Sequence, residues 1–350
     1  MATSYALLVY LLLHVTFSTT TTTAAATTKP RRLVTRLLHR DSLLHNPNDT
    51  IAAQAERFLN SSITRFIYLS ENINSETRPD DDIQPGLLLG SKAPLFYVSF
   101  FVGQPPVPQL AIMDTGSDLI WVNCNPVCKN CGPVFYPSRS STFAKMPCNH
   151  TLCLNCSPSD ECNYSVTLVL GGAVIEGYST PLEIANGLYY LILEGISIGE
   201  KRVEIDSEIF KRTSSNDGVF IDSGSTYTWL TPTAYQAVRR EIEGLCKGLL
   251  TRLPYPWAPD GYLCYFGKVS RDVEGFPAMT FHFAEGADLV LDVYGMFLQV
   301  EAHVFCLAIL PSEDRKSLIG MIAQQNYNVA YDLGKSRLYL QRIDCELLGD

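Results

Sequence analysis

The chain has 350 residues, enough for two domains, and its 46% hydrophobic and 18% charged residues are typical of a globular protein with large cores. A formal net charge of −9 argues against nucleic acid as a partner. Beyond the N-terminus, no stretch reaches the ~18 consecutive apolar residues that would span a membrane.

Residues 1–25 are predicted to be a secretory signal peptide, because Tyr5–Phe17 is mostly apolar and small residues follow up to Ala26. We therefore expect a secreted protein in the apoplast, with the vacuole as the alternative. Asn-x-Ser/Thr glycosylation triplets agree with secretion. They begin at Asn48, Asn60, Asn149, Asn155 and Asn163.

Residues 26–90 are predicted to be a pro-segment. Basic residues gather between Lys29 and Arg40, and Ala52–Tyr68 has the apolar spacing of a helix. A basic helical segment in an acidic protein can lie over a carboxylate site and keep it closed at neutral pH. A disordered leader is the alternative. Asp80–Asp82, followed by Pro85 and Gly86, predicts an exposed linker that could be processed.

From Ala93 onward the sequence predicts many short strands, because brief apolar runs are bounded by Gly and Pro. One convincing helix interrupts them at Pro232–Leu250. Many strands with few helices indicate an all-β fold. The expected strands are Leu95–Val102, Leu110–Met113, Leu188–Ile198, Val219–Ile221, Met279–Phe283, Leu289–Val293 and Val304–Leu310.

One motif occurs twice: apolar residues run directly into Asp, a small hydroxyl residue, Gly and Ser. The copies are Ala111–Ser117 and Val219–Ser225. The Gly permits a sharp turn after the strand, so each Asp is held at a fixed tip. Two copies indicate two similar lobes, each contributing one carboxylate, Asp114 and Asp222, to a shared site.

Two carboxylates within hydrogen-bond reach cannot both ionise, so they share one proton and titrate as a pair. The ionised member can take a proton from a water that attacks a carbonyl carbon, while the protonated member donates to the carbonyl oxygen. This chemistry is acid-favoured hydrolysis of an amide bond without a covalent intermediate. It needs no cofactor and no metal.

Cysteines are concentrated in one region. The spacing of two Cys-x-x-Cys pairs there would suit a zinc site. The predicted signal peptide favours disulfides instead, because secreted proteins pass through oxidising compartments. No His cluster supplies a metal site. An odd number of cysteines in this group leaves one thiol without a partner. The group is Cys124, Cys128, Cys131, Cys148, Cys153, Cys156 and Cys162.

From Phe96 to the C-terminus the chain resembles the pepsin-like aspartic proteases, in particular their plant, nepenthesin-like branch. The segments that carry the resemblance are FYVSFFVGQPP, IMDTGSDLIWVNC, FYPSRSSTF, GISIG, GVFIDSGSTYTWL and SLIGMIAQQNYNVAYDL. The resemblance implies a bilobal pepsin-like acid protease fold with an N-terminal lobe at residues 91–180 and a C-terminal lobe at 181–350. It also implies a cysteine-rich insert in the first lobe.

By the same resemblance, Asp114 and Asp222 are the catalytic pair and Trp121 lines the cleft wall. Leu318–Gly320 would brace the second catalytic loop. The resemblance also pairs Cys264 with Cys306 and Cys246 with Cys345. The residues expected to support the two loops are Thr115, Gly116, Ser117, Ser223, Gly224 and Ser225.

The first lobe departs from the family because it is short. Soon after Cys162–Ser165 comes the segment Leu168–Leu182, which resembles the family's bridge between the two lobes. The flap hairpin of the family, with its Tyr and glycines, and a brace for the Asp114 loop are both missing. A flap excludes water and orders the peptide, so its loss bears on activity.

Two functional readings follow. The first is a secreted, monomeric aspartic endopeptidase that is made as a zymogen and acts on peptides or proteins. The second is a catalytically impaired homologue that binds peptides or proteins, or a truncated product without the flap.

Overall fold

The computed structural model describes residues 37–39, 49–72, 96–116, 134–144, 148, 153–156, 162–164, 176–214, 217–254 and 262–343. All of them belong to one compact unit of the chain, Val34–Val166 with Val174–Asp350. The other unit, Met1–Leu33 with Thr167–Ala173, lies outside the described residues. The predicted signal peptide and the Asp80–Asp82 linker therefore lie outside them as well.

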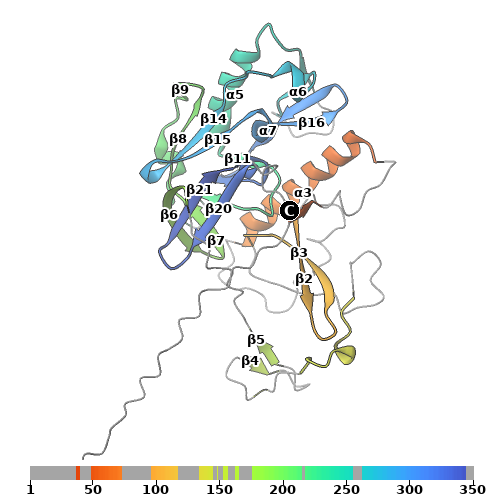
Figure 1. The fold of residues 1–350 in the computed structure, drawn as a ribbon. Helices are drawn as coiled ribbons and strands as arrows, with labels where there is room; N and C mark the ends of the chain where they lie inside the picture. The colour runs from red at the N-terminus through yellow and green to blue at the C-terminus, as the bar shows by residue number, and fades with distance from the viewer. Residues whose placement is uncertain are drawn as a thin grey trace, which may run out of the picture. The chain divides into compact units, whose positions relative to one another are not determined.

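Strands greatly outnumber helices, so the all-β prediction is confirmed (Figure 1). The helices are α3 (Ile51–Asn72), α5 (Pro232–Cys246), α6 (Val269–Asp272) and α7 (Val293–Met296), with short 3₁₀ turns η1 (Pro137–Arg139), η2 (Ser207–Phe210), η3 (Ala284–Gly286) and η4 (Ile322–Gln324). The strands are β1 (Leu37–His39), β2 (Phe96–Val102), β3 (Val107–Ile112), β4 (Cys153–Cys156), β5 (Cys162–Tyr164), β6 (Tyr178–Ala185), β7 (Leu188–Leu191), β8 (Leu193–Ile198), β9 (Lys201–Arg202), β10 (Asp217–Ile221), β11 (Thr228–Leu230), β12 (Arg252–Leu253), β13 (Cys264–Phe266), β14 (Met279–Phe283), β15 (Ala287–Leu291), β16 (Phe297–Glu301), β17 (Val304–Leu307), β18 (Ile309–Pro311), β19 (Arg315–Ile319), β20 (Tyr327–Asp332) and β21 (Arg337–Arg342).

The first Asp motif follows a small antiparallel sheet with the order β1-β2-β3. Strands β2 and β3 form a hairpin, in which Tyr97 lies opposite Ile112. Strand β1 comes from the predicted pro-segment and pairs with the other side of β2. Among the described residues β3 pairs only with β2, so the strand that leads to Asp114 is an edge strand.

The second Asp motif follows β10, which lies inside an eight-stranded sheet of order β18-β11-β19-β10-β7-β6-β21-β20. Strand β10 pairs in parallel with β19 and antiparallel with β7. All five of its residues are buried. A strand with partners on both sides and apolar residues on both faces is fixed in position.

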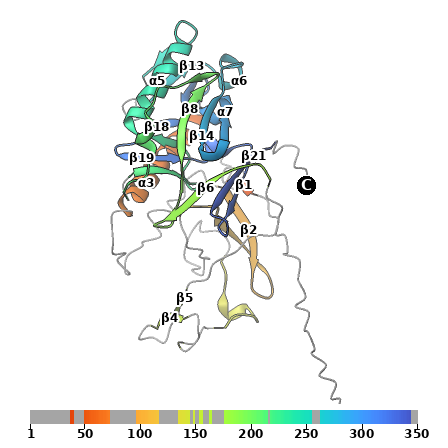
Figure 2. The same cartoon turned by 90° about the vertical axis from the view of Figure 1, so that its left-hand side faces the viewer.

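Two predicted strands are each divided between two sheets. The chain leaves the eight-stranded sheet at Ile192 and enters the sheet of order β15-β14-β8-β9, where β8 runs beside β14 (Figure 2). It likewise passes from β17, in the sheet of order β12-β13-β17-β16, into β18 at Ala308. Apolar runs that continue through such a switch predict one long strand, but the structure contains two.

Both predicted helices are present. Helix α5 begins at Pro232, where the missing N–H of proline costs no hydrogen bond, and it ends at Cys246. Helix α3 extends four residues beyond the predicted Tyr68. One side of α3 is buried in an apolar cluster with the eight-stranded sheet, so the disordered-leader alternative is wrong for this segment. The helix residues in this cluster are Ala55, Phe58, Leu59, Phe66 and Leu69.

Candidate active site

The loop that carries Asp222 is held by the neighbouring strand β19. The backbone N–H of Asp222 donates to the carbonyl of Ile319 at 3.1 Å, directly continuing the parallel pairing of β10 with β19. Gly320 packs so tightly against the carbonyl of Tyr227 that no side chain would fit there. The Leu318–Gly320 segment thus lies where the sequence analysis expected a brace.

The Asp222 carboxylate is fully buried and accepts hydrogen bonds from its own loop. Ser225 Oγ donates to Oδ2 at 2.7 Å, and the N–H of Gly224 donates to Oδ1 at 3.0 Å. The side chain of Asp222 has 0% exposure. A buried carboxylate needs such partners, because burial without them penalises its charge.

Asp114 lies in an equivalent but more open loop. The N–H of Gly116 donates to its Oδ1 at 2.9 Å, as Gly224 does for Asp222. Its side chain keeps 16% exposure, and the preceding Met113 is 37% exposed. The two copies of the motif therefore form the same turn, but only the second is enclosed by its own sheet.

The two loops are joined by reciprocal hydrogen bonds. The N–H of Thr115 donates to Ser223 Oγ at 3.2 Å, and the N–H of Ser223 donates to Thr115 Oγ1 at 2.9 Å. Ser223 Oγ also donates to the carbonyl of Met113 at 2.8 Å. Segments 108 residues apart in sequence are thus held together by the hydroxyl residues of the repeated motif.

The motif glycines allow the two carboxylates to approach. A Cβ on Gly116 would lie 2.8 Å from Asp222 Oδ1, and a Cβ on Gly224 would collide with Asp114 Oδ1. Each glycine thus faces the carboxylate of the other loop, and any larger residue would displace it. The structure brings Asp114 and Asp222 into one site.

A cation lies between the two carboxylates. Arg65 of helix α3 places Nη2 2.5 Å from Asp114 Oδ1 and Nε 3.3 Å from Asp222 Oδ2. Its side chain is only 11% exposed. Sequence analysis expected a basic segment over the carboxylates but placed its basic residues between Lys29 and Arg40, so it missed Arg65.

Arg65 and Asp222 change each other's proton affinity. Burial alone would raise the pKa of Asp222, but the charge of Arg65 and the hydrogen bond from Ser225 outweigh it, and the pKa of this carboxyl is lowered. Burial alone would lower the pKa of Arg65, but the charges of Asp222 and Asp114 raise it. With Arg65 in place, the ionised form of Asp222 is therefore favoured.

Further contacts fix α3 above the site. Ser62 Oγ accepts from the N–H of Tyr227 and from Nε1 of Trp229, each at 3.2 Å. The ring of Phe66 stacks on Trp229 with centroids 4.7 Å apart. Phe66 follows Arg65 directly, so the same turn of α3 supplies the cation and an aromatic anchor. This turn occupies the space in front of the carboxylates.

Comparison with known proteins agrees with this geometry. Residues 96–178 match the family described as xylanase inhibitor N-terminal, and residues 188–342 match the family described as xylanase inhibitor C-terminal. The chain is 25% identical to probable aspartic protease At2g35615 of Arabidopsis thaliana, with 99% of both chains covered. It is 27% identical to aspartic proteinase nepenthesin-1 of Nepenthes gracilis over 71% of this chain and 78% of that one. The chain belongs to the plant pepsin-like aspartic proteases.

Solved structures give the same fold. The crystal structure of edgp superposes with a TM-score of 0.53 at 14% identity, covering 71% of this chain and 92% of that chain. Together with the paired N- and C-terminal family matches, this shows the bilobal pepsin-like fold.

The predicted shortening of the first lobe of this pepsin-like protease stays a prediction. The alignment with the Arabidopsis relative is 466 residues long, so at least 116 of its positions hold no residue of this 350-residue chain. Reading the transcript across Tyr164–Leu168 tests whether they belong here. About a hundred additional codons at this junction would restore an ordinary first lobe, and an uninterrupted junction in every transcript would mean a genuinely compact variant.

The cysteines of the second lobe behave differently from one another. Cys264 and Cys306 form a disulfide between β13 and β17, as the family resemblance implied. Cys246 is a free, buried thiol, so its predicted bond to Cys345 is wrong in this structure. It lies at the end of α5 beside Tyr265, and burial raises the pKa of the thiol. Cys345 lies outside the described residues.

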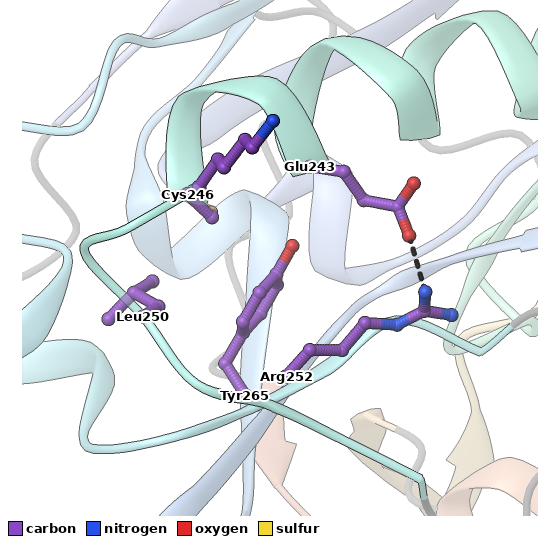
Figure 3. Close-up of a pocket in the computed structure, with 6 residues that line it drawn as sticks. Glu243, Cys246, Leu250, Arg252 and Tyr265 are labelled. Atoms are coloured by element: carbon purple, nitrogen blue, oxygen red, sulfur yellow. Dashed lines mark ion pairs between the residues drawn. The ribbon is translucent and has the colours of Figure 1, made fainter.

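A cavity of about 250 Å³ adjoins Cys246 (Figure 3). Tyr265 and Leu250 line it, and Glu243 forms an ion pair with Arg252 at 2.9 Å. None of these residues belongs to the carboxylate site. The cavity therefore takes no part in the chemistry of Asp114 and Asp222.

Several residues singled out in the sequence lie outside the described part of the chain or in its short strands. Ser117 and Trp121 lie outside the described residues, as do Cys124, Cys128, Cys131, Asn48 and Asn149. Cys148 is disulfide-bonded. Cys153, Cys156, Cys162, Asn155 and Asn163 are located only as positions in β4 and β5. Asn60 lies on the exposed side of α3.

Within the described part of the chain, no group of three or more His, Cys, Asp or Glu residues could hold a metal ion. No helix there is long and apolar enough to cross a membrane.

Proposed function

We propose that this chain is the precursor of a secreted aspartic endopeptidase that hydrolyses peptide bonds at acid pH. The observation that carries the proposal is the convergence of two hydrogen-bonded Asp loops on one site. The family supports protease activity at a coarser level, because the relatives found are named as aspartic proteases.

In the active form, Arg65 has left and the two carboxylates share one proton. A water between them loses a proton to the ionised carboxylate and attacks the peptide carbonyl carbon, while the protonated carboxyl donates to the carbonyl oxygen. Ser225 and Gly224 keep Asp222 oriented through these steps, since they donate to its two oxygens. Gly116 does the same for Asp114.

We further propose that α3 is an inhibitory pro-segment that opens in acid. The pKa of Asp222 is lowered in the closed form, so its ion pair with Arg65 stabilises that form fully above the ordinary Asp pKa of about 3.9. This stabilisation is lost as the pH falls through the lowered value, because protonation removes the negative charge. Arg65 stays charged throughout.

Secretion, N-glycosylation and a monomeric state complete the proposal. The apolar N-terminus and the exposed Asn60 support secretion and glycosylation. Deleting residues 1–25 should prevent export from plant cells. The exported chain should lose mass on treatment with a glycosidase and sediment as a monomer.

The dyad is tested with casein at pH 3–5 and with pepstatin as inhibitor. Asp114→Asn and Asp222→Asn should each reduce hydrolysis by at least about 10²–10⁴-fold, because each removes a proton-transfer group. Asp206→Asn changes an exposed carboxylate outside the site and should keep full activity. Activity that survives in either site variant, or that resists pepstatin, would refute the proposal.

Inhibition by α3 is tested with Arg65→Met. The unmodified chain should become active only after exposure to pH below about 3.9, whereas Arg65→Met should open at higher pH because nothing neutralises the paired carboxylates. Arg57→Met is the matched control, since Arg57 lies on the same helix but pairs with Asp49. Equal activation profiles for Arg65→Met and Arg57→Met would contradict an inhibitory role for Arg65.

A further inference from the structure

A second cation lies buried beneath α3, and the chemistry of the Asp pair does not use it. The side chain of Lys316 on β19 has 1% exposure. Its Nζ donates to the carbonyl of Ser70 at 3.1 Å and lies 3.2 Å from Asp314 Oδ2. An ammonium has three hydrogens to donate, and burying one is costly unless it is well paired. The partner from α3 is a neutral carbonyl.

Lys316 lies on the face of the sheet that α3 covers. Side chains alternate along a strand, so Lys316 and Leu318 share one face of β19, and Ser317 and Ile319 share the other. Leu318 belongs to the apolar cluster that includes Phe66 of α3, whereas Ile319 belongs to the other core. Removing α3 would therefore uncover Lys316 together with an apolar surface.

Helix geometry gives the separation along α3 between Arg65, which contacts the Asp pair, and Ser70, which contacts Lys316. Ser70 follows Arg65 by five residues, which is about 7.5 Å along an α-helix. The Arg65 side chain contacts the carboxylates, and the Ser70 carbonyl accepts from the Lys316 ammonium. An extended peptide advances about 3.3 Å per residue, so this distance equals about two residues of a bound substrate.

We propose that Lys316 forms a subsite for an acidic substrate side chain, about two residues from the bond that is cut. The proposal rests on the proposed function, because α3 must leave before a peptide can enter. Departure of α3 removes the Ser70 carbonyl from the ammonium. A Glu or Asp carboxylate from the substrate then takes that place and forms a charge-assisted hydrogen bond.

Other charges near Lys316 do not fill this role. Asp314 pairs with it from the connection just before β19, but its side chain is 34% exposed, so water competes for this carboxylate. On the adjacent strand β10, the Asp217 carboxylate accepts hydrogen bonds from Thr213 and Ser214. Leu318, Phe220 and the ring of Trp229 supply apolar surface beside the subsite. The substrates that fit are apolar peptides with one acidic residue.

The test compares matched peptides that differ only in Glu or Gln, placed two residues to either side of the cut bond. The acid-activated full chain is assayed for kcat/KM from pH 3 to pH 5.5. The Glu peptide should be favoured about tenfold at pH 5, and the preference should fade towards pH 3, because Glu protonates with a pKa of about 4.3.

Variants assign this preference to Lys316. Lys316→Met should give equal rates for the Glu and Gln peptides at every pH, and Lys316→Arg should restore part of the preference. Lys335→Met removes an exposed lysine that pairs with Asp332, and it should keep the tenfold ratio. The pH dependence in the unmodified chain decides the matter if Lys316→Met fails to fold.

The outcomes separate the two proposals. If neither peptide is cut, the proposed function fails and the subsite fails with it. Pepstatin-sensitive cleavage at equal rates for Glu and Gln at pH 5 overturns the subsite alone. A preference for Glu that persists unchanged in Lys316→Met also overturns it.

Discussion

The two copies of the Asp motif differ in what holds them. Asp222 follows a strand that is buried along its whole length and paired on both sides. Asp114 follows a strand with a pairing partner on one side only among the described residues, and its neighbour Met113 is 37% exposed. Partners of the Asp114 loop across the site include Ser223, Arg65 and Tyr331. The second lobe thus holds its Asp from strands on both sides, and the described first loop is tied to it through these contacts.

This difference makes Gly224 the most sensitive position in the site. In Gly224→Ala, the new Cβ would push Asp114 away, and a misplacement of about 1 Å costs about 10²-fold in rate. We expect pepstatin-sensitive hydrolysis of casein to fall by at least that factor. Gly244→Ala is the control, because a Cβ at this α5 position meets nothing within 4 Å. Full activity in Gly224→Ala would mean that Asp114 does not face Gly224.

The same comparison predicts unequal losses of stability when the residue before each Asp is replaced by Ala. Ile221→Ala opens a void in the main core and should lower the free energy of unfolding by about 2–5 kcal/mol. Met113→Ala changes a partly exposed side chain and should cost less than about 1 kcal/mol. Urea denaturation followed by circular dichroism measures both. Equal costs would show that the first loop is as well enclosed as the second.

The smallest expected effect concerns the hydrogen bonds between the loops. Thr115→Val removes the acceptor for the Ser223 N–H and should lower activity by about tenfold or less. Ser223→Ala removes the other bond, from the Thr115 N–H, and the double variant should lose more activity than either single variant. Thr142→Val, on an exposed turn, should leave activity unchanged. Full activity in the double variant would contradict a role for these two bonds in positioning the loops.

Much of the site could be predicted from short-range pattern. The repeated Asp-hydroxyl-Gly-Ser motif gave both loops, since apolar strands and turn residues are local signals. The segment Leu318–Gly320 was expected as a brace by family resemblance, and the structure places it beside Asp222. Helix α3 was predicted from its apolar spacing.

The remaining features depend on long-range contacts. Only packing decides which cation of α3 faces the carboxylates, so Arg65 gave no local signal. The burial of Lys316 on β19 likewise depends on the packing of α3 over that strand. The chain changes sheets at Ile192 and at Ala308. The strands before and after each of these residues are both buried, so the apolar run is continuous and gives no signal of the change. The Cys246–Cys345 pairing was inferred from resemblance, and in this structure the thiol is buried beside Tyr265 instead.

An experimental structure of the full chain at neutral pH tests the central claim most directly. We predict that the Asp114 and Asp222 carboxylates face each other across the Arg65 guanidinium, with the Thr115–Ser223 hydrogen bonds formed. Carboxylates that point into separate solvent, or an Arg65 side chain that contacts neither, would contradict the account.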